Sequence, residues 1–361
     1  MINQSWRLGT FAKIPVKIHW TFPLILIYVV ANGLSNHNPW ENILVEVCFV
    51  MSMFCCVVLH EFGHALTARR YHIQTEDIIL LPIGGVARLR NMPDKPSHEL
   101  VIAVMGPVVN VIIAAVIFGY LYYLNGLSFF TNEEFNQIEL LNWNIFLPIL
   151  LIANIFLVLF NMIPAFPMDG GRVLRALLSF KLGKLKATLW ASRIGQFICI
   201  LFIGFGIYYE AWTTVLIGVF IFIAAMQEYQ SVSLDFTLKG KIAKMVCRKI
   251  SYVITSYMSV QEAMAIVLSS GDKNFIITNF NGEFTSSISA EEISAAVKQN
   301  PDQRISDLNL HEILFLEPNR TLKDLMFYLN QGYPLVVIKE GPEILGVIDR
   351  QALEHYLSLN K

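Results

Sequence analysis

The sequence predicts an α-helical polytopic membrane protein with a soluble α/β module at its carboxy-terminal end. Of the 361 residues, 55% are hydrophobic and only 15% are charged, whereas soluble proteins average about 25% charged residues. Apolar runs long enough to cross a bilayer occur only before about Ser231. The formal net charge of -1 argues against a nucleic-acid partner, because proteins that bind nucleic acids normally carry a basic face.

Six apolar runs predict six transmembrane helices. They extend over residues 19–34, 43–66, 101–124, 145–163, 189–209 and 212–226. No small-residue cleavage site follows the first run, so we expect that run to be a retained membrane anchor rather than a signal peptide.

The distribution of basic residues between these runs predicts their orientation. Lys and Arg precede the first run and recur in alternate connections: Arg7, Lys13, Lys17, Arg69, Arg70, Arg88, Arg90, Lys95, Arg172, Arg175, Lys181, Lys184 and Lys186. The other connections, around "SNHNPWEN", "NGLSFFTNEEFNQIELLNWN" and "EA", contain no Lys or Arg. Because basic connections stay in the cytoplasm, we expect both termini there and the protein in the cell (inner) membrane.

The pattern changes after about Ser231. Strand-like runs such as "NFIIT", "PLVVI" and "LGVI" alternate with amphipathic stretches such as "SVQEAMAIVLSS" and "TLKDLMFYLNQG". Two halves, residues 251–300 and 304–359, each follow the order helix, strand, strand, helix. We therefore expect a transmembrane domain over residues 1–230 and a soluble cytoplasmic module over residues 231–361.

The motif "HEFGH" lies in the second apolar run and places His60 and His64 one helical turn apart. This spacing lets two imidazoles bind one Zn2+. The adjacent Glu61 can take a proton from an attacking water, the general-base role in metal-assisted hydrolysis. The alternative is a pair of structural histidines, which would leave three costly polar side chains in an apolar helix without a purpose.

A catalytic zinc site needs a third protein ligand, and the best candidate is Asp169 in "NMIPAFPMDGGR". Pro164 and Pro167 end the fourth run, after which Asp169 either caps the next helix or binds metal. His60 lies about 25 Å along the second helix, close to the cytoplasmic side of a hydrocarbon core about 30 Å thick. The fourth run crosses in the same direction, so Asp169 follows it on the same cytoplasmic side of the membrane. This placement favours metal binding by Asp169 over helix capping.

These motifs together resemble the site-2 protease family of intramembrane zinc metalloproteases. The resemblance extends to "LLPIGGVARL" after the second run and to "GPVVN" in the third. It implies a metalloendopeptidase with one Zn2+ per chain. The site residues that it implies are the metal ligands His60, His64 and Asp169, the catalytic residues Glu61 and Asn161, and the substrate-binding residues Gly84, Gly85 and Asn110.

Physical arguments support some of these roles and leave alternatives open. Asn161 could donate to a tetrahedral oxyanion or only repair the backbone beside the prolines. The "PIGG" stretch could lie in a strand whose edge pairs with an unwound substrate, since glycine permits close backbone approach, or form an ordinary turn. Asn110 could equally be an interhelical hydrogen-bonding residue.

The carboxy-terminal module resembles a tandem pair of cystathionine-β-synthase (CBS) domains, chiefly in "GYPLVVI" and "LGVIDRQAL". The family has a subgroup with six spans and such a pair. CBS domains that bind adenine nucleotides usually carry an aspartate where Ala352 stands, and a glycine and an aspartate where Ser286 and Glu292 stand. The alternatives are an adenine nucleotide at the pair and an unliganded module for homodimerisation or docking.

The predicted function is therefore an intramembrane zinc metalloprotease that acts on membrane-embedded or membrane-tethered proteins near the cytoplasmic face, as in regulated intramembrane proteolysis. Its expected partners are a transmembrane protein substrate and the lipid bilayer. The alternatives are a CBS-regulated metal transporter or channel and a catalytically inactive protease-like binding protein. A transport site has no need of Glu61 directly after the first histidine, and the complete set of site residues argues against an inactive protein.

Overall fold

The computed structural model describes residues 5–82, 84–89, 93, 95–126 and 140–359. The chain divides into two compact units, with the boundary between Val232 and Ser233. Arg90 and most of the basic-free connection around residues 125–144 lie outside the described residues.

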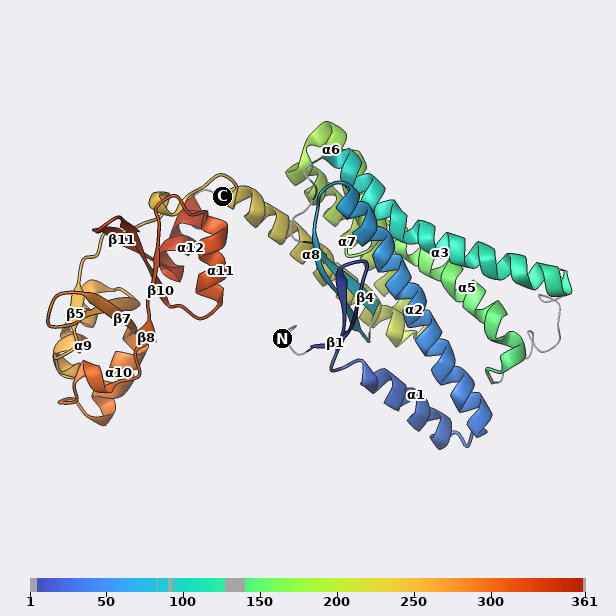
Figure 1. Ribbon diagram of the computed structural model, residues 1–361, viewed down its shortest axis with the longest axis horizontal. Helices are drawn as coiled ribbons and strands as arrows, with labels where there is room; N and C mark the ends of the chain where they lie inside the picture. Colours follow the sequence, from blue (N-terminus) through green and yellow to red (C-terminus); the bar gives the residue numbers. More distant parts are fainter. Residues whose placement is uncertain (1–4, 83, 90–92, 94, 127–139, 360–361) are drawn as a thin grey trace. The chain divides into compact units, whose positions relative to one another are not determined.

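Helices form most of the first unit (Figure 1). They are α1 (Pro23–Ser35), α2 (Trp40–Arg70), α3 (Pro96–Asn125), α5 (Trp143–Asn161), α6 (Asp169–Leu182), α7 (Lys184–Tyr208) and α8 (Trp212–Leu238), the last of which continues into the second unit. Among the described residues, five helices are long and apolar enough to cross a membrane: α2, α3, α5, α7 and α8. The protein is thus a multi-pass membrane protein.

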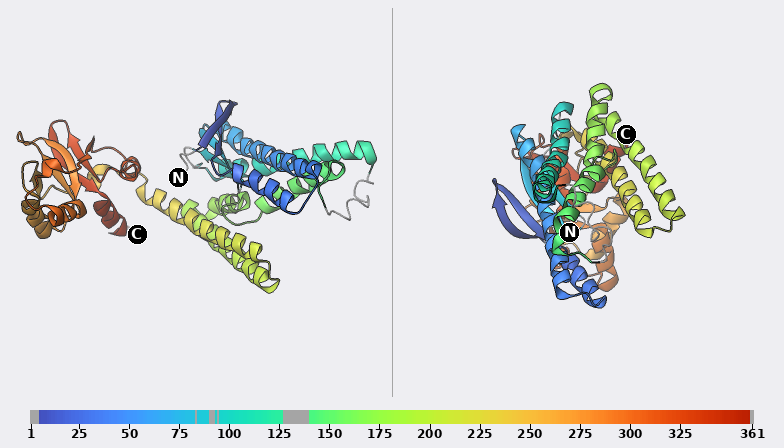
Figure 2. Two further views of the ribbon diagram at one scale, coloured as in Figure 1. Left: turned by 90° about the horizontal axis from the view of Figure 1, so that it is seen from below. Right: turned by 90° about the vertical axis from the view of Figure 1, so that its right-hand side faces the viewer.

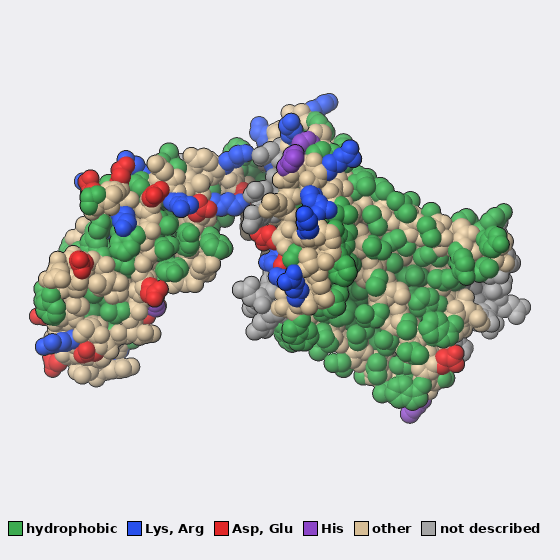
Figure 3. Space-filling view, viewed as in Figure 1, with side chains coloured by type: hydrophobic (Ala, Val, Ile, Leu, Met, Phe, Trp, Pro, Cys, Tyr) green, Lys and Arg blue, Asp and Glu red, His purple; other side chains and the backbone are tan. Residues whose placement is uncertain are grey.

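The surface of the first unit fits this assignment. On the face shown in Figure 3, hydrophobic side chains cover the helices, and Lys and Arg gather toward the end where α2 finishes and α6 lies. α7 and α8 run side by side (Figure 2), joined by a hydrogen bond from Ser192 Oγ to the Ala225 carbonyl oxygen at 2.6 Å.

The first predicted span is shorter than expected. α1 has 13 residues, which gives a length of about 20 Å against a hydrocarbon core about 30 Å thick. The reason is that the run begins with His19, the last residue of β2, and a turn over residues 20–22, so the helix starts only at Pro23. Six complete crossings, and with them the cytoplasmic placement of both termini, stay predictions.

A four-stranded sheet packs against α2. Its strands are β1 (Ser5–Phe11), β2 (Ile14–His19), β3 (Thr75–Leu81) and β4 (Gly84–Leu89), in the order β1-β2-β3-β4. β2 and β3 are parallel, and the other neighbours are antiparallel. Ile14, Val16 and Ile78 pack with Ala65 of α2 in a buried cluster. β4 is therefore an edge strand, held close to α2.

Asp77 ties three strands of this sheet together. Its buried carboxylate accepts hydrogen bonds from Arg88 of β4 at 2.5 and 2.6 Å and forms an ion pair with Lys17 of β2 at 2.7 Å. Burial raises the pKa of Asp77, but the hydrogen bonds from Arg88 and Lys17 outweigh this effect and hold its pKa below the ordinary value.

Each half of the second unit contains the predicted order helix, strand, strand, helix, preceded by one or two short strands outside that prediction. The first half contains β5 (Val253–Thr255), α9 (Val260–Ser270), β6 (Asn274–Thr278), β7 (Phe284–Ser289) and α10 (Ala290–Gln299). The second contains β8 (His311–Glu312), β9 (Leu314–Leu316), α11 (Leu322–Asn330), β10 (Leu335–Glu340), β11 (Glu343–Asp349) and α12 (Arg350–Leu359). The sheets have the orders β5-β6-β7-β8 and β11-β10-β9. Each half has its own buried apolar core.

Candidate metal centre

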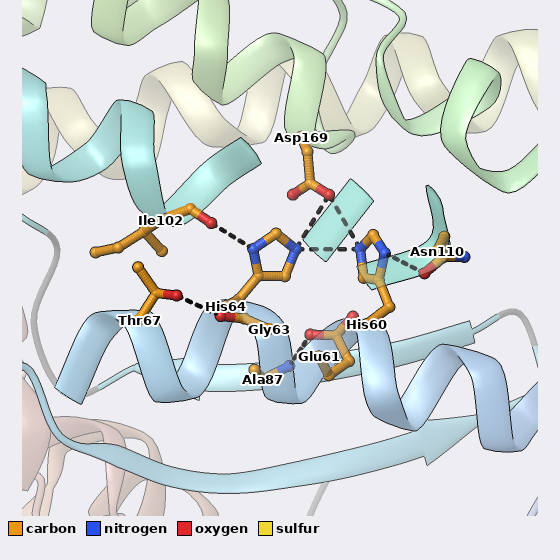
Figure 4. Close-up of polar contacts among 9 residues, drawn as sticks. All are labelled: His60, Glu61, Gly63, His64, Thr67, Ala87, Ile102, Asn110 and Asp169. Atoms are coloured by element: carbon orange, nitrogen blue, oxygen red, sulfur yellow. Dashed lines mark hydrogen bonds and ion pairs between the residues drawn. The ribbon is translucent and has the colours of Figure 1, made fainter. Parts of the chain in front are cut away.

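Three side chains from two distant segments converge inside the first unit (Figure 4). His60 and His64 lie on one face of α2, and Asp169 is the first residue of α6. The Nε2 atoms of the two histidines are 3.1 Å apart, and Asp169 Oδ2 lies 3.1 Å from each of them. All three side chains are buried. Among the described residues, this is the group of metal-binding side chains that could hold an ion.

The spacing of these three atoms fits a tetrahedral zinc ion. Ligand atoms that bind such an ion with bonds of about 2.0–2.1 Å lie about 3.3 Å from one another. The observed separations of 3.1 Å differ from this value by about 0.2 Å, within the tolerance expected of a metal site. Two imidazoles and one carboxylate leave the fourth position open, as catalytic zinc sites do.

The outer nitrogen of each imidazole is also engaged. His64 Nδ1 donates to the Ile102 carbonyl oxygen at 2.7 Å, and His60 Nδ1 lies 3.1 Å from Asn110 Oδ1. Because these oxygens only accept hydrogen bonds, the protons of the neutral rings belong on Nδ1. Both Nε2 lone pairs then point toward the same carboxylate oxygen, an arrangement that a metal cation bound between the three atoms would stabilise. Partners of this kind fix the tautomer and orientation of metal-binding histidines.

One face of α3 provides these outer contacts. Ile102, Gly106 and Asn110 are spaced four residues apart in α3, so they lie in a row along one side of the helix. A Cβ atom on Gly106 would lie 2.1 Å from His64 Nε2 and 2.7 Å from His60 Nε2. The missing side chain of Gly106 thus leaves the space in which the histidine nitrogens meet.

Asp169 reaches the histidines because the chain turns back after α5. α5 ends at Asn161, before Pro164 and Pro167, as the prolines predict. A Cβ on Gly170 would lie 2.3 Å from the Ile163 carbonyl oxygen, so glycine lets α6 begin directly against this turn. The N-cap of α6 is Met168 rather than Asp169, and Asp169 Oδ2 contacts His60 and His64, which favours the metal-binding alternative over helix capping.

Glu61 points toward the sheet rather than toward Asp169 (Figure 4). Its Oε2 accepts a hydrogen bond from the Ala87 backbone N–H of β4 at 3.0 Å. A Cβ on Gly85 would lie 2.9 Å from Glu61 Cγ, so glycine permits the close approach of β4 to Glu61. Gly84 is the first residue of the same strand. The "PIGG" stretch therefore leads into an edge strand beside Glu61.

The structure brings together most of the residues predicted from sequence and leaves one apart. Asn161 lies half-buried at the end of α5, and no hydrogen bond joins its side chain to the described residues of the centre. Asn110 is fully buried, and its Nδ2 has no hydrogen-bond partner among the described residues. The sequence places Gly106 in the "GPVVN" motif but assigns no role to it or to the Ile102 carbonyl. The spacing of Gly106 four residues before Asn110 could have indicated the first, whereas a backbone carbonyl has no sequence signal.

In the second unit, the positions expected to contact a nucleotide engage protein partners. The Glu292 carboxylate accepts hydrogen bonds from the Ser289 backbone N–H at 2.9 Å and hydroxyl at 2.7 Å, and pairs with His311 at 2.8 Å. Ala352 donates its backbone N–H to Asp349. The Glu292 carboxylate is thus already bound by Ser289 of the same half and by His311 of β8.

Comparisons with known proteins identify similar sequences and structures. The profile of Peptidase family M50 matches residues 48–202. A zinc metalloprotease of Methanocaldococcus jannaschii is 37% identical over 267 residues, which are 74% of this chain and 73% of that protein. Among solved structures, the site-2 protease from Methanocaldococcus jannaschii aligns with 36% identity and a TM-score of 0.45, covering 62% of this chain and 95% of that one. A hemolysin-like protein of Oenococcus oeni that contains a CBS domain aligns with 16% identity and a TM-score of 0.32, covering 34% of this chain and 95% of that one.

Proposed function

The chain belongs to peptidase family M50, the site-2 protease family of membrane zinc metalloproteases, and on this premise we propose that it hydrolyses peptide bonds of membrane-embedded or membrane-tethered proteins. The observation that carries the proposal is the set of three ligand atoms 3.1 Å apart beside a carboxylate that is not needed as a ligand. His60, His64 and Asp169 would hold one Zn2+. When bound, zinc supplies Lewis-acid polarisation of a carbonyl and makes water a stronger nucleophile near neutral pH.

Glu61 acts as the proton-transfer group in this proposal. It directly follows His60 in the chain, and its carboxylate is fixed by the Ala87 N–H at 3.0 Å. A carboxylate in this place takes a proton from the attacking water and returns one to the leaving amine nitrogen. A metal-storage or transport site has no use for such a group, which supports an enzyme over those alternatives.

Substrate binding is proposed along the free edge of β4. A transmembrane helix hides its peptide groups in internal hydrogen bonds, so the substrate must become extended before it can be cut. The Ala87 N–H is donated to Glu61 rather than to β3, so the unpaired edge of β4 faces the proposed base. A peptide added to this edge by strand pairing would lie beside Gly84 and Gly85 and next to the metal ligands.

Two asparagines remain candidates for contact with the reacting carbonyl. Asn110 has a buried Nδ2 without a partner among the described residues, and its Oδ1 already orients His60. Because Asn110 lies on the Nδ1 side of His60, the contact of its Nδ2 with a substrate is a proposal that rests on the family resemblance. Asn161, at the end of α5, is proposed to contact the oxyanion or the substrate.

The biological setting follows from the same reasoning. We propose a role in regulated intramembrane proteolysis at the cytoplasmic face of the cell membrane, with a transmembrane domain over residues 1–230 and a cytoplasmic CBS module over residues 231–361. The module is proposed to mediate homodimerisation or docking, because the Glu292 carboxylate is already occupied by Ser289 and His311.

Replacement of Glu61 by glutamine tests the proposal. Cells carrying wild type or Glu61→Gln are compared by membrane proteomics, and both purified proteins are analysed for zinc. We expect the variant to keep its zinc and to accumulate uncut substrates. Identical proteomes and unchanged peptide-bond cleavage would contradict the protease assignment. Metal flux into vesicles that survives Glu61→Gln would instead identify a transporter.

A further inference from the structure

A fully buried arginine lies two helical turns after the proposed metal ligand in α6. Arg175 is only 2% exposed and is the largest of the fully buried side chains described. Its guanidinium contacts Glu99 of α3 at 2.6 Å through Nε and Nη2, and Glu228 of α8 at 2.5 Å through Nη1. It also lies over the ring of Phe166, 4.9 Å from the centroid. One side chain thus joins α6 to two other helices and to the turn before Asp169.

The partners of Arg175 lie next to the groups that form the metal centre. Glu99 is three residues before Ile102, whose carbonyl oxygen orients His64 at 2.7 Å. Phe166 is buried in the turn that leads directly into Asp169. Arg175 therefore fixes α6 against the same turn of α3 that holds one histidine, and it packs on the segment that delivers the carboxylate.

The chemistry of this cluster indicates a geometric role rather than a gain in stability. Replacing a buried ion pair by apolar residues of similar volume is often neutral or stabilising, so stability alone does not explain the buried pair Arg175 and Glu99 with the partly exposed Glu228 beside it. A guanidinium presents donors in a rigid planar fork and can bind two carboxylates in fixed directions. Such a contact defines the position and rotation of α6, which an apolar contact would define less strictly.

We propose that Arg175 is a positioning residue that holds Asp169 in register with His60 and His64, through its ion pairs with Glu99 and Glu228. This inference rests on the proposed metal-dependent function and adds a group that touches neither metal nor substrate. Loss of partners outside the ligand set typically weakens metal affinity or activity about 10–100-fold. We expect a loss of this size when the cluster is removed.

The test uses the full-length protein in detergent. The double variant Glu99→Leu with Arg175→Met replaces the buried ion pair by apolar side chains, and Glu228→Gln provides a second, milder variant at a partly exposed position. Ser192→Ala is the matched control, because it removes the buried hydrogen bond between α7 and the Ala225 carbonyl of α8 without touching α6. Zinc affinity is measured by chelator competition, and the visible absorption of bound Co2+ reports the ligand geometry.

We expect the double variant to unfold within a few degrees of wild type but to bind zinc about 10–100-fold more weakly, with altered Co2+ bands. Glu228→Gln should also weaken zinc binding and alter the Co2+ bands. If the double variant does not fold, Glu228→Gln alone tests the positioning role of Arg175. Ser192→Ala should leave both readouts unchanged. Wild-type affinity and Co2+ bands in the cluster variants, or an equal loss in Ser192→Ala, would overturn the inference. A wild-type protein that binds no metal would instead overturn the proposed function itself.

Discussion

Replacing Gly106 by alanine is expected to abolish metal binding while leaving the fold intact. The added Cβ would lie 2.1 Å from His64 Nε2, 2.4 Å from its Cε1 and 2.7 Å from His60 Nε2. Ordinary contacts of a Cβ atom begin near 3.4 Å. The His64 ring must therefore retreat by about 1.3 Å, whereas metal–ligand distances tolerate changes of only about 0.2 Å.

The magnitude follows from this displacement. Zn–N bonds are about 2.0–2.1 Å long, so a nitrogen moved by this distance no longer binds. Loss of an outer partner alone costs about 10–100-fold in affinity, and loss of a ligand is expected to cost at least about 100-fold. The helix propensity of alanine, about 0.5–1 kcal/mol better than that of glycine in a helix interior, offsets part of the overpacking cost of about 1–3 kcal/mol, so the protein is expected to stay folded.

The chain contains a matched control in the same helix. A Cβ on Gly119 would meet no atom within 4 Å, so Gly119→Ala has the same chemistry without the collision. Zinc content and affinity are measured by chelator competition, and thermal unfolding is followed for both variants. We expect Gly119→Ala to resemble wild type in zinc binding and Gly106→Ala to lose zinc. Wild-type zinc affinity in Gly106→Ala would refute the assignment of the metal position.

Three further predictions follow from the described contacts. Removing the metal with a chelator is expected to stop peptide-bond cleavage and to lower the thermal unfolding midpoint, with recovery on adding Zn2+; activity that survives complete removal would contradict the metal assignment. Asn110→Leu, which frees His60 Nδ1, should weaken zinc binding about 10–100-fold, and unchanged affinity would show that this contact does not orient the ring. Because the pKa of Asp77 is lowered in the folded sheet, its contribution to stability is present above the unfolded pKa and is lost as the pH falls through the folded value. Arg88→Met raises that folded pKa, so acid unfolding followed by circular dichroism should begin at a higher pH than in wild type.

Much of the centre could be predicted because its signals are local. The i, i+4 spacing of His60 and His64 follows directly from helical periodicity, and the proline turn before Asp169 marks the end of a helix. Bringing the two segments together needed only helix length and membrane thickness. The five long helices were also indicated by their apolar runs, with α8 continuing to Leu238, beyond the predicted end of the run.

Other features depend on contacts that the sequence does not encode locally. The first apolar run predicts a whole span, but its first residue, His19, pairs with Ser5 in the sheet, and a turn over residues 20–22 precedes the helix. Only tertiary packing sets where strand, turn and helix divide there. Arg175 was counted among the basic residues that set orientation, yet its side chain is buried between two glutamates. A single sequence does not distinguish a basic residue in contact with lipid headgroups from one that pairs inside the fold.

The hydrogen bond between Glu61 and the Ala87 N–H has a consequence for specificity. A peptide that pairs with β4 and the carboxylate that serves its hydrolysis would both be positioned from the same strand. The bond to be cut would then be chosen by register, the number of residues from the point where the peptide enters the sheet, more than by the side chains on either side of it. The selectivity of such an enzyme would depend on how easily the substrate helix unwinds. The residues on either side of the cleaved bond could then vary widely.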